Sequence, residues 1–326
     1  MRRRDFIKGI AGSAATWPLT ARAQQPAMPV IGFLGVGSAQ SDTFRVTGFE
    51  QGLKEAGFVK GQNLTIEYRW AEDHYDRLPA MVADLVRLQV AVIVATSASA
   101  SLAAKAATTT LPIVFETAGD PVKLGFVGSL SRPGGNLTGV TQLGEEEAPK
   151  RLQLLHELLP TARVMALLVN PTDQLGESQV RVSLEAAKSL GLELHVLNAS
   201  VERDFDAAFS KLTELRAGAL AIAGSSLFTG HIERLAALTV RHRIPAVYQR
   251  HEFATAGGLV SYGTNIADTH RLVGIYTGRV LKGEKPADLP VQQATKVELY
   301  INLKTAKALG ITVPIPLLGR ADEVIE

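Results

Sequence analysis

A run of small hydroxyl-bearing residues, Thr96-Ser97-Ala98-Ser99-Ala100-Ser101, lies between an apolar segment and an alanine-rich segment. The run therefore joins the end of a predicted strand to the start of a predicted helix. Free backbone N–H groups at a helix start, assisted by hydroxyl groups, can bind a carboxylate or a phosphate. The same residue types also serve as ordinary helix caps, worth about 1 kcal/mol each. The residues alone leave binding and capping open, and one residue can do both.

Polar residues follow the other apolar runs in the same way. Gly37 and Ser38 come after the first run, and Glu116 and Asp120 come after a later one. A carboxylate there could hold a ligand ammonium group, although for Asp120, which precedes a proline, a turn is the simpler interpretation. The corresponding positions in the second half are Asn170, Ser225, Ser226, Tyr248 and Tyr262. The tyrosines suit a flat organic ligand, and they are equally usual at a half-buried rim.

Sequence motifs for catalysis and for metal binding are missing. The chain has no cysteine, and its seven histidines form no H-E-x-x-H arrangement. There is no phosphate-binding G-x-x-x-x-G-K-[ST] and no G-x-S-x-G nucleophile motif. The glycines of segment 32–37 are not in the order of a dinucleotide site. We therefore expect no catalytic residue, no metal and no cofactor.

Short β-branched runs alternate with helical patterns from Val30 onward, which is typical of parallel sheets covered by helices. The predicted strands of the first half are Val30–Leu34, Leu64–Arg69, Val90–Ala95, Pro112–Phe115 and Leu137–Thr141. Those of the second half are Val164–Val169, Leu192–Leu197, Ala219–Ala223, Pro245–Tyr248 and Leu259–Tyr262. Because ligands of open α/β sheets bind beyond the carboxyl ends of the strands, the polar residues described above are the candidates for a site.

The alternation of strand and helix patterns is interrupted around Gln142–Glu147. The acidic run Glu145-Glu146-Glu147 at this point is most simply a solvated helix start, because negative charge favours the N-terminal end of the helix dipole. The interruption separates two sets of about five strands. It therefore predicts two similar α/β lobes.

Residues 1–23 have the three parts of an export signal in order. A basic start is followed by a short apolar stretch and by Ala21-Arg22-Ala23, which is typical of a signal-peptidase site. The segment Arg3-Arg4-Asp5-Phe6-Ile7-Lys8 is also typical of a twin-arginine signal. We expect cleavage after Ala23 and a soluble, periplasmic mature protein.

The formal net charge gives no reason to expect nucleic acid or an anionic membrane as a partner. Residues 1–23 hold five basic residues and one acidic residue, so their removal changes the net charge from +2 to −2. The basicity thus belongs to the signal. No later segment approaches the roughly 20 apolar residues of a membrane span, so no direct membrane insertion is expected.

Distinctive motifs are spread over nearly all of the chain after the signal. They are Pro112–Phe115 with Gly119–Val122, Arg132–Val140, Lys150–Leu152 with Leu154–Leu158, Gly257–Gly263, Leu281–Pro290, Ile301–Gly310 and Arg320–Glu323. Together they resemble the substrate-binding proteins of ABC transporters in the tryptophan/aromatic-amino-acid-binding-like family. This resemblance agrees with the export signal, the two predicted lobes and the missing catalytic motifs.

The resemblance implies a type I periplasmic-binding-protein fold, in which two Rossmann-like lobes joined by three crossings close on a ligand like a Venus flytrap. The crossings are expected near Gln142–Glu145, Gly263–Asn265 and Val291–Ala294. The N-terminal lobe would then comprise residues 28–142 and 264–290, and the C-terminal lobe residues 143–263 and 291–326. Both lobes are thus discontinuous in sequence.

The resemblance also implies a set of ligand contacts from the strand exits of both lobes. Carried over by position, they are Gly37, Ser38, Thr96, Ser97, Ala98, Glu116, Asp120, Asn170, Ser225, Ser226, Tyr248 and Tyr262. The segments Thr96–Ser101 and Phe115–Thr117 depart from the family's usual residues. Both lie in the region that sets specificity, so tryptophan or phenylalanine does not follow from the resemblance.

The function implied is the periplasmic solute-binding component of an ABC importer, which captures an amino acid or a similar aromatic acid. The implied partners are the small ligand and a permease in the inner membrane, and the protein is expected to be monomeric. A ligand carboxylate would bind at residues 96–98, its ring against Tyr248 or Tyr262, and a polar group at Glu116. Two alternatives are a ligand-sensing module for a receptor kinase and a Rossmann-type hydrolase or oxidoreductase.

Overall fold

The computed structural model describes residues 28–142 and 146–326. All ten predicted strands form, within two residues of the predicted bounds. The predicted signal lies outside the described residues, as does Glu145 of the acidic run. No helix in the described ranges is long and apolar enough to cross a membrane.

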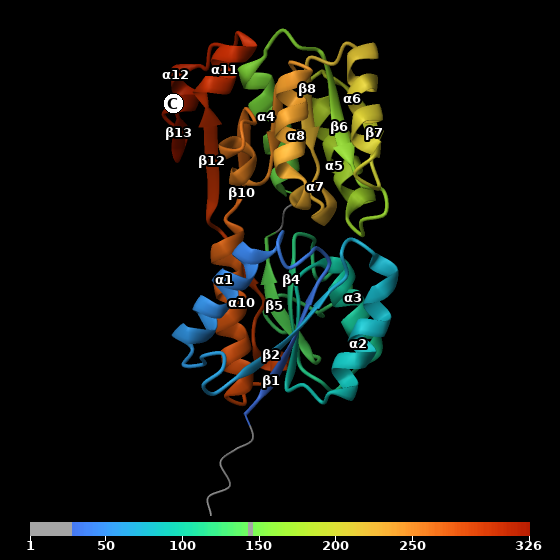
Figure 1. Ribbon diagram of the computed structural model, residues 1–326, viewed down its shortest axis with the longest axis vertical. Coiled ribbons are helices and arrows are strands. Elements are labelled where there is room, and N and C mark those ends of the chain that lie inside the picture. Colours follow the sequence, from blue (N-terminus) through green and yellow to red (C-terminus); the bar gives the residue numbers. More distant parts are fainter. Residues whose placement is uncertain (1–27, 143–145) are drawn as a thin grey trace, which may run out of the picture.

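The strands form two separate sheets, stacked end to end (Figure 1). The first has the order β11-β5-β4-β3-β1-β2 and is parallel throughout. Its strands are β1 (Val30–Gly35), β2 (Thr65–Trp70), β3 (Val92–Ala95), β4 (Ile113–Thr117), β5 (Leu137–Thr141) and β11 (Gln292–Gln293). Continuous burial of β1, β3, β4 and β5 explains why they read as apolar runs in the sequence.

The second sheet has the order β13-β12-β10-β9-β8-β6-β7, and its pair β10–β12 is antiparallel. The strands are β6 (Val164–Val169), β7 (Glu193–Asn198), β8 (Ala219–Ile222), β9 (Ala246–Tyr248), β10 (Val260–Thr264), β12 (Val297–Asn302) and β13 (Glu323–Ile325). Three of these strands, β11, β12 and β13, were not predicted from the sequence. The antiparallel β12 is half-buried along part of its length, so it lacks a continuous apolar run.

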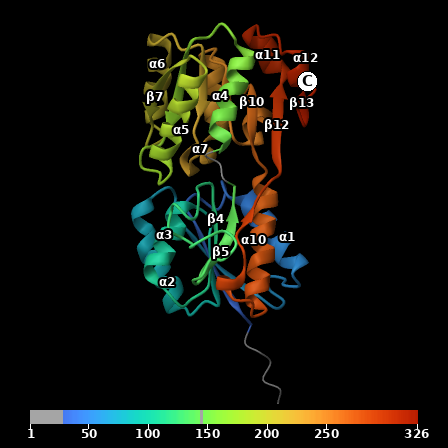
Figure 2. The same cartoon turned by 180° about the vertical axis from the view of Figure 1, so that it is seen from behind.

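Helices cover both faces of the first sheet. Alternate residues of β1 point to opposite faces, so Ile31 and Phe33 lie in one core and Leu34 lies in the other. The first of these cores is closed by α1 (Thr43–Glu55) and α10 (Ile266–Leu281), and the second by α2 (Leu78–Arg87) and α3 (Ala98–Ala107). Figures 1 and 2 place α10 and β12 along one side of the molecule, and α2 and α3 along the other.

Glycine allows α1 to pack directly against the backbone of α10, although the two helices are more than 200 residues apart in sequence. A Cβ atom at Gly52 would lie 1.9 Å from the carbonyl oxygen of Arg271, and one at Gly48 would lie 2.3 Å from that of Ala267. No larger residue fits at Gly52 without moving one of the helices. This contact fixes the position of α1, which carries side chains to the site described below.

The second sheet is covered in the same way. One core lies beneath α6 (Asp204–Glu214), α7 (Ser226–Gly230), α8 (Ile232–Arg241) and α9 (His251–Thr255). The other lies beneath α4 (Glu147–Leu158), α5 (Gly176–Ser189), α11 (Leu303–Leu309) and α12 (Ile315–Leu318). Each sheet thus has its own two cores, as expected for two α/β lobes.

The chain passes between the sheets after β5, between β10 and α10, and between β11 and β12. Because β11 pairs with β5, residues 292–293 belong to the first sheet, although the predicted C-terminal lobe begins at 291. The lobe bounds otherwise stay a prediction.

Glu147 corrects the expectation of a solvated helix start, because it is buried. Its carboxylate accepts a hydrogen bond from the Thr264 hydroxyl and forms an ion pair at 3.3 Å with Arg151, one helical turn further on. Arg151 also donates to the carbonyl oxygen of Tyr262 at 3.3 Å. The first turn of α4 thus packs against the end of β10, a contact distant in sequence, so the acidic pattern could not reveal it.

Candidate ligand-binding site

A cavity lies between the two sheets, at the carboxyl ends of their strands. The first sheet's loops and helices contribute Arg45, Tyr75, Thr96, Ser97, Ala98, Ser99, Glu116, Ala118, Gln142 and Ile266. The second contributes Asp173, Leu175, Gln179, Gly224, Ser225, Ser226, Thr229 and Gln249. Six of the predicted residues therefore meet at this cavity, namely Thr96, Ser97, Ala98, Glu116, Ser225 and Ser226. The volume of about 70 Å³ has room for only a few water molecules.

The hydroxyl-rich run forms the first turn of α3. Ser97 is the N-cap, and its hydroxyl oxygen accepts a hydrogen bond from the Ala100 N–H at 3.1 Å. The Thr96 hydroxyl donates to the carbonyl oxygen of Leu34 at 3.2 Å. Both side chains thus have structural roles, while the backbone N–H groups of Ala98 and Ser99 belong to the first turn, which lacks intrahelical acceptors. These N–H groups, on the cavity wall, are the anion-binding feature of the first lobe.

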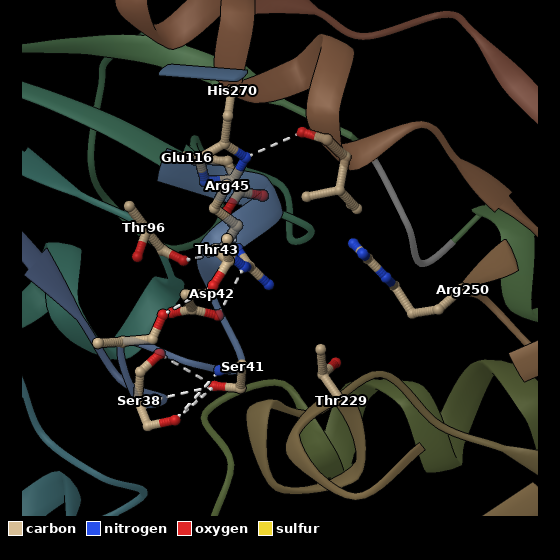
Figure 3. Close-up of polar contacts among 12 residues, drawn as sticks. Ser38, Ser41, Asp42, Thr43, Arg45, Thr96, Glu116, Thr229, Arg250 and His270 are labelled. Carbon is tan, nitrogen blue, oxygen red and sulfur yellow. Dashed lines mark hydrogen bonds and ion pairs between the residues drawn. The ribbon is translucent and has the colours of Figure 1, made fainter. Parts of the chain in front are cut away.

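Glu116 is fully engaged within the first lobe. One carboxylate oxygen lies 3.3 Å from Nη1 of Arg45, a residue that Figure 3 shows beside Glu116. The other oxygen accepts a hydrogen bond from the Gln142 side chain. Burial raises the pKa of Glu116, and the positive charge of Arg45 opposes this rise. Because Arg45 already compensates its charge, Glu116 serves to orient Arg45 and Gln142.

Asp173 lines the cavity and has no lysine or arginine beside it among the described residues. Its Oδ1 accepts a hydrogen bond from the Leu175 N–H at 3.0 Å, and its Oδ2 accepts one from the Tyr75 hydroxyl at 3.1 Å. Burial raises the pKa of Asp173, and no lysine or arginine of the described residues contributes to its environment. A buried carboxylate without a counter-charge favours a cationic group of a ligand.

The bond between Tyr75 and Asp173 joins the two lobes. Tyr75 begins a short 3-10 helix, η1 (Tyr75–Arg77), in the first lobe, and Asp173 follows β6 in the second. Tyr75 also places its aromatic ring on the cavity wall. Because the bond requires the lobes to be close together, the structure represents a closed arrangement.

A side chain of α5 fixes the second lobe's loop after β8. The Gln179 amide donates to the carbonyl oxygen of Gly224 at 2.9 Å and accepts from its N–H at 2.6 Å. This paired contact holds the backbone immediately before Ser225 and Ser226. Both serines are thus presented to the cavity by an ordered loop.

Three of the predicted site residues lie in turns away from the cavity, namely Gly37, Ser38 and Asp120. Ser38, next to Gly37, accepts and donates hydrogen bonds within a turn to Ser41, including one from its N–H at 2.9 Å. The Asp120 carboxylate accepts from the N–H of Val122 at 2.9 Å, as the turn interpretation expects. These contacts use the polar groups to shape loops before α1 and after β4.

The remaining three predicted site residues lie behind the residues with which the second lobe lines the cavity, namely Asn170, Tyr248 and Tyr262. Asn170 is buried and donates to the Ser225 hydroxyl at 3.3 Å. Tyr248 is fully buried in the core, with its hydroxyl 3.0 Å from that of Thr229. Tyr262 packs against the other core of that lobe. Neither tyrosine ring lines the cavity, because β9 and β10 direct these side chains into the two cores.

Five cavity residues were not predicted as ligand contacts from the sequence, namely Arg45, Tyr75, Asp173, Gln179 and Gln249. Asp173 had a usable signal, because it lies four residues after the end of β6, in the same exit as Asn170. Gln249 likewise follows β9 directly. No sequence signal marked Arg45, because it projects from α1 and reaches the site only through the packing of that helix.

Two parallel-dominated α/β lobes with a polar cavity between their strand ends define a type I periplasmic-binding-protein fold. Residues 33–325 match the model of a family described as ABC transporter substrate binding protein. The chain therefore belongs to this family of substrate-binding proteins.

A tyrosine-binding protein from Clostridioides difficile (strain R20291) is 26% identical over 264 residues, which cover 81% of this chain and 76% of that protein. An ABC domain from Streptococcus pneumonia in complex with L-Trp has a TM-score of 0.82 at 25% identity, over 91% of this chain and 99% of that one. A conserved domain protein from Vibrio cholerae has a TM-score of 0.85 at 24% identity, with the same coverage.

Proposed function

We propose that this protein is the periplasmic solute-binding component of an ABC importer and that its ligand is an amino acid, with aromatic amino acids as the first candidates. The observation that carries the proposal is the pairing of opposite features across one cavity. The first turn of α3 presents N–H groups from one lobe, and Asp173 presents a buried carboxylate without a counter-charge from the other. An α-amino acid carries the matching carboxylate and ammonium groups.

Capture proceeds by closure of the lobes. A ligand that contacts α3 and Asp173 at once binds the closed form better than the open one, and so shifts the population toward it. Because the cavity of about 70 Å³ is small, a ligand with an aromatic side chain would displace side chains that line it while the lobes stay closed. The Tyr75 ring, which belongs to the first lobe, is positioned to contact such a side chain. The names of two relatives, one binding tyrosine and one holding L-Trp, support this ligand class.

Thermal unfolding of residues 24–326 against a panel of amino acids, aromatic acids, purines and short peptides tests the proposal. A ligand at 100 times its Kd adds about 2.7 kcal/mol, or roughly 5–10 °C for lobes of this size. We expect a shift with one or more amino acids. A shift with purines alone would contradict the proposed ligand class. So would the absence of a shift with every compound, provided that native mass spectrometry shows the protein to carry no ligand.

We also propose that the protein reaches the periplasm by the twin-arginine route, works there as a monomer and delivers its ligand to a permease in the inner membrane. The basis is the sequence of residues 1–23 together with membership of the family. The intact mass of the exported protein should correspond to cleavage after Ala23. Replacing Arg3 and Arg4 by lysine should stop export, and normal export of that variant would point to the general route.

A further inference from the structure

A cation–π contact joins the lobes outside the cavity. The guanidinium carbon of Arg250 lies 3.8 Å from the centroid of the Phe44 ring. Phe44 belongs to the first turn of α1 in the first lobe, and Arg250 follows β9 in the second. Figure 3 shows the Arg250 side chain extending from the second lobe toward Arg45 on α1. Opening of the lobes would separate Phe44 from Arg250.

Arg250 is held rigidly for this contact. Its Nε and Nη2 atoms donate to the two carboxylate oxygens of Glu252 at 3.2 and 2.6 Å. The residue is 3% exposed, and among the described residues its Nη1 has no hydrogen-bond acceptor. A buried guanidinium nitrogen without an acceptor is costly, and the face of the Phe44 ring is the compensating contact.

The contact is separate from the cavity in which the ligand is proposed to bind. Neither Phe44 nor Arg250 lines that cavity. Both line a second cavity of about 640 Å³ between the lobes, which shares Thr229 with the first. The contact therefore favours closure whether or not a ligand is present, and it acts against the repulsion between the positive charges of Arg45 and Arg250.

We propose that Phe44 and Arg250 form a latch that stabilises the closed form and thereby sets ligand affinity without touching the ligand. This proposal rests on the proposed function, because it assumes capture by closure. The apparent Kd of a ligand that needs the closed form equals its intrinsic Kd divided by the closed fraction. A desolvated cation–π contact changes the ratio of closed to open forms by about fivefold to thirtyfold. Loss of the latch should therefore raise the apparent Kd by up to the same factor.

Phe44→Leu tests the latch, because leucine retains apolar contact and removes the ring face. Phe58→Leu is the matched control, since Phe58 is a partly buried phenylalanine in a core of the first lobe. The chain has no cysteine, so Val86→Cys on α2 and Leu184→Cys on α5 give one exposed labelling site in each lobe. Distances between spin labels at these sites are measured without ligand, and the Kd values of L-tyrosine and L-tryptophan are measured by calorimetry.

We expect Phe44→Leu to shift the ligand-free distances toward longer values and to raise the Kd of a bound probe measurably, by at most fivefold to thirtyfold, with Phe58→Leu unchanged in both. Unchanged distances in Phe44→Leu overturn the latch. A higher Kd with unchanged distances would make Phe44 a ligand contact, and longer distances with an unchanged Kd would separate the latch from affinity. If neither probe binds the wild type, aromatic amino acids fail as the first candidates for the ligand, while the distances still decide on the latch.

Discussion

The exchange of Asp173 for asparagine separates ligand recognition from folding. Asparagine is nearly isosteric, and its Oδ1 can still accept the Leu175 N–H hydrogen bond. Because burial disfavours the ionised carboxylate, as its raised pKa indicates, the ligand-free variant should be at least as stable as the wild type. Asp173→Asn should therefore fold normally, with an unchanged or higher Tm.

Ligand binding should weaken strongly in the same variant. A hydrogen bond between a carboxylate and an ammonium group contributes about 1.5–3 kcal/mol, so the Kd of an amino-acid ligand should rise about 10- to 150-fold. Isothermal titration of L-tyrosine and L-tryptophan measures this change. The control is Asp76→Asn, which removes the same charge at an exposed position next to Tyr75.

A ligand analogue locates the lost interaction. The compound 3-(4-hydroxyphenyl)propionate corresponds to tyrosine without its ammonium group. Wild-type protein should bind it more weakly than L-tyrosine, and Asp173→Asn should bind both with similar affinity, because the two changes remove one shared contact. Equal weakening of both compounds by the variant, or unchanged affinity for L-tyrosine, would refute the assignment of Asp173 to the ammonium group.

Three further perturbations test the fold around the site. Burial raises the pKa of Asp73 from 3.8 to about 6, so between these pH values the folded protein holds a proton that the unfolded chain has lost. The free energy of unfolding therefore falls as the pH rises through this range. Urea titrations should find Asp73→Asn up to about 3 kcal/mol more stable than wild type at pH 7 and equal to it below pH 4. Gly52→Ala should lower the unfolding free energy by about 1–3 kcal/mol, because its Cβ would meet the backbone of Arg271, and an unchanged Tm would contradict the close packing of α1 and α10. Glu147→Gln leaves Arg151 buried without its ion-pair partner and should cost about 3–5 kcal/mol in the same titrations, whereas a loss below 1 kcal/mol would place the pair in water.

The central parallel strands, such as β3 and β4, could be predicted from the sequence because burial on both faces makes them continuous apolar runs. The loop Thr96–Ser101 could then be placed at the site, because it follows one of these strands and ligands of open α/β sheets bind beyond the carboxyl ends of the strands. The acidic residue at 147 could not be placed, because its burial depends on Thr264 and Arg151 rather than on its neighbours in the run.

Side chains that reach the site through packing were beyond the sequence pattern. Arg45 lies on a helix whose position is set by glycine contacts with α10, a helix more than 200 residues later. Tyr75 meets Asp173 only when two separate lobes come together. Conversely, Tyr248 stands at the carboxyl end of a strand, where a ligand contact is expected, but its side chain points into the core. The last residue of a strand can face either side of the sheet.

A crystal structure of residues 24–326 with the amino acid that gives the largest thermal shift tests the central claim most directly. The proposed function predicts a ligand between the lobes, with its carboxylate on the N–H groups of Ala98 and Ser99 and its ammonium group within hydrogen-bond distance of Asp173. A ligand bound outside the cleft, or one that turns its carboxylate toward Asp173, would contradict it.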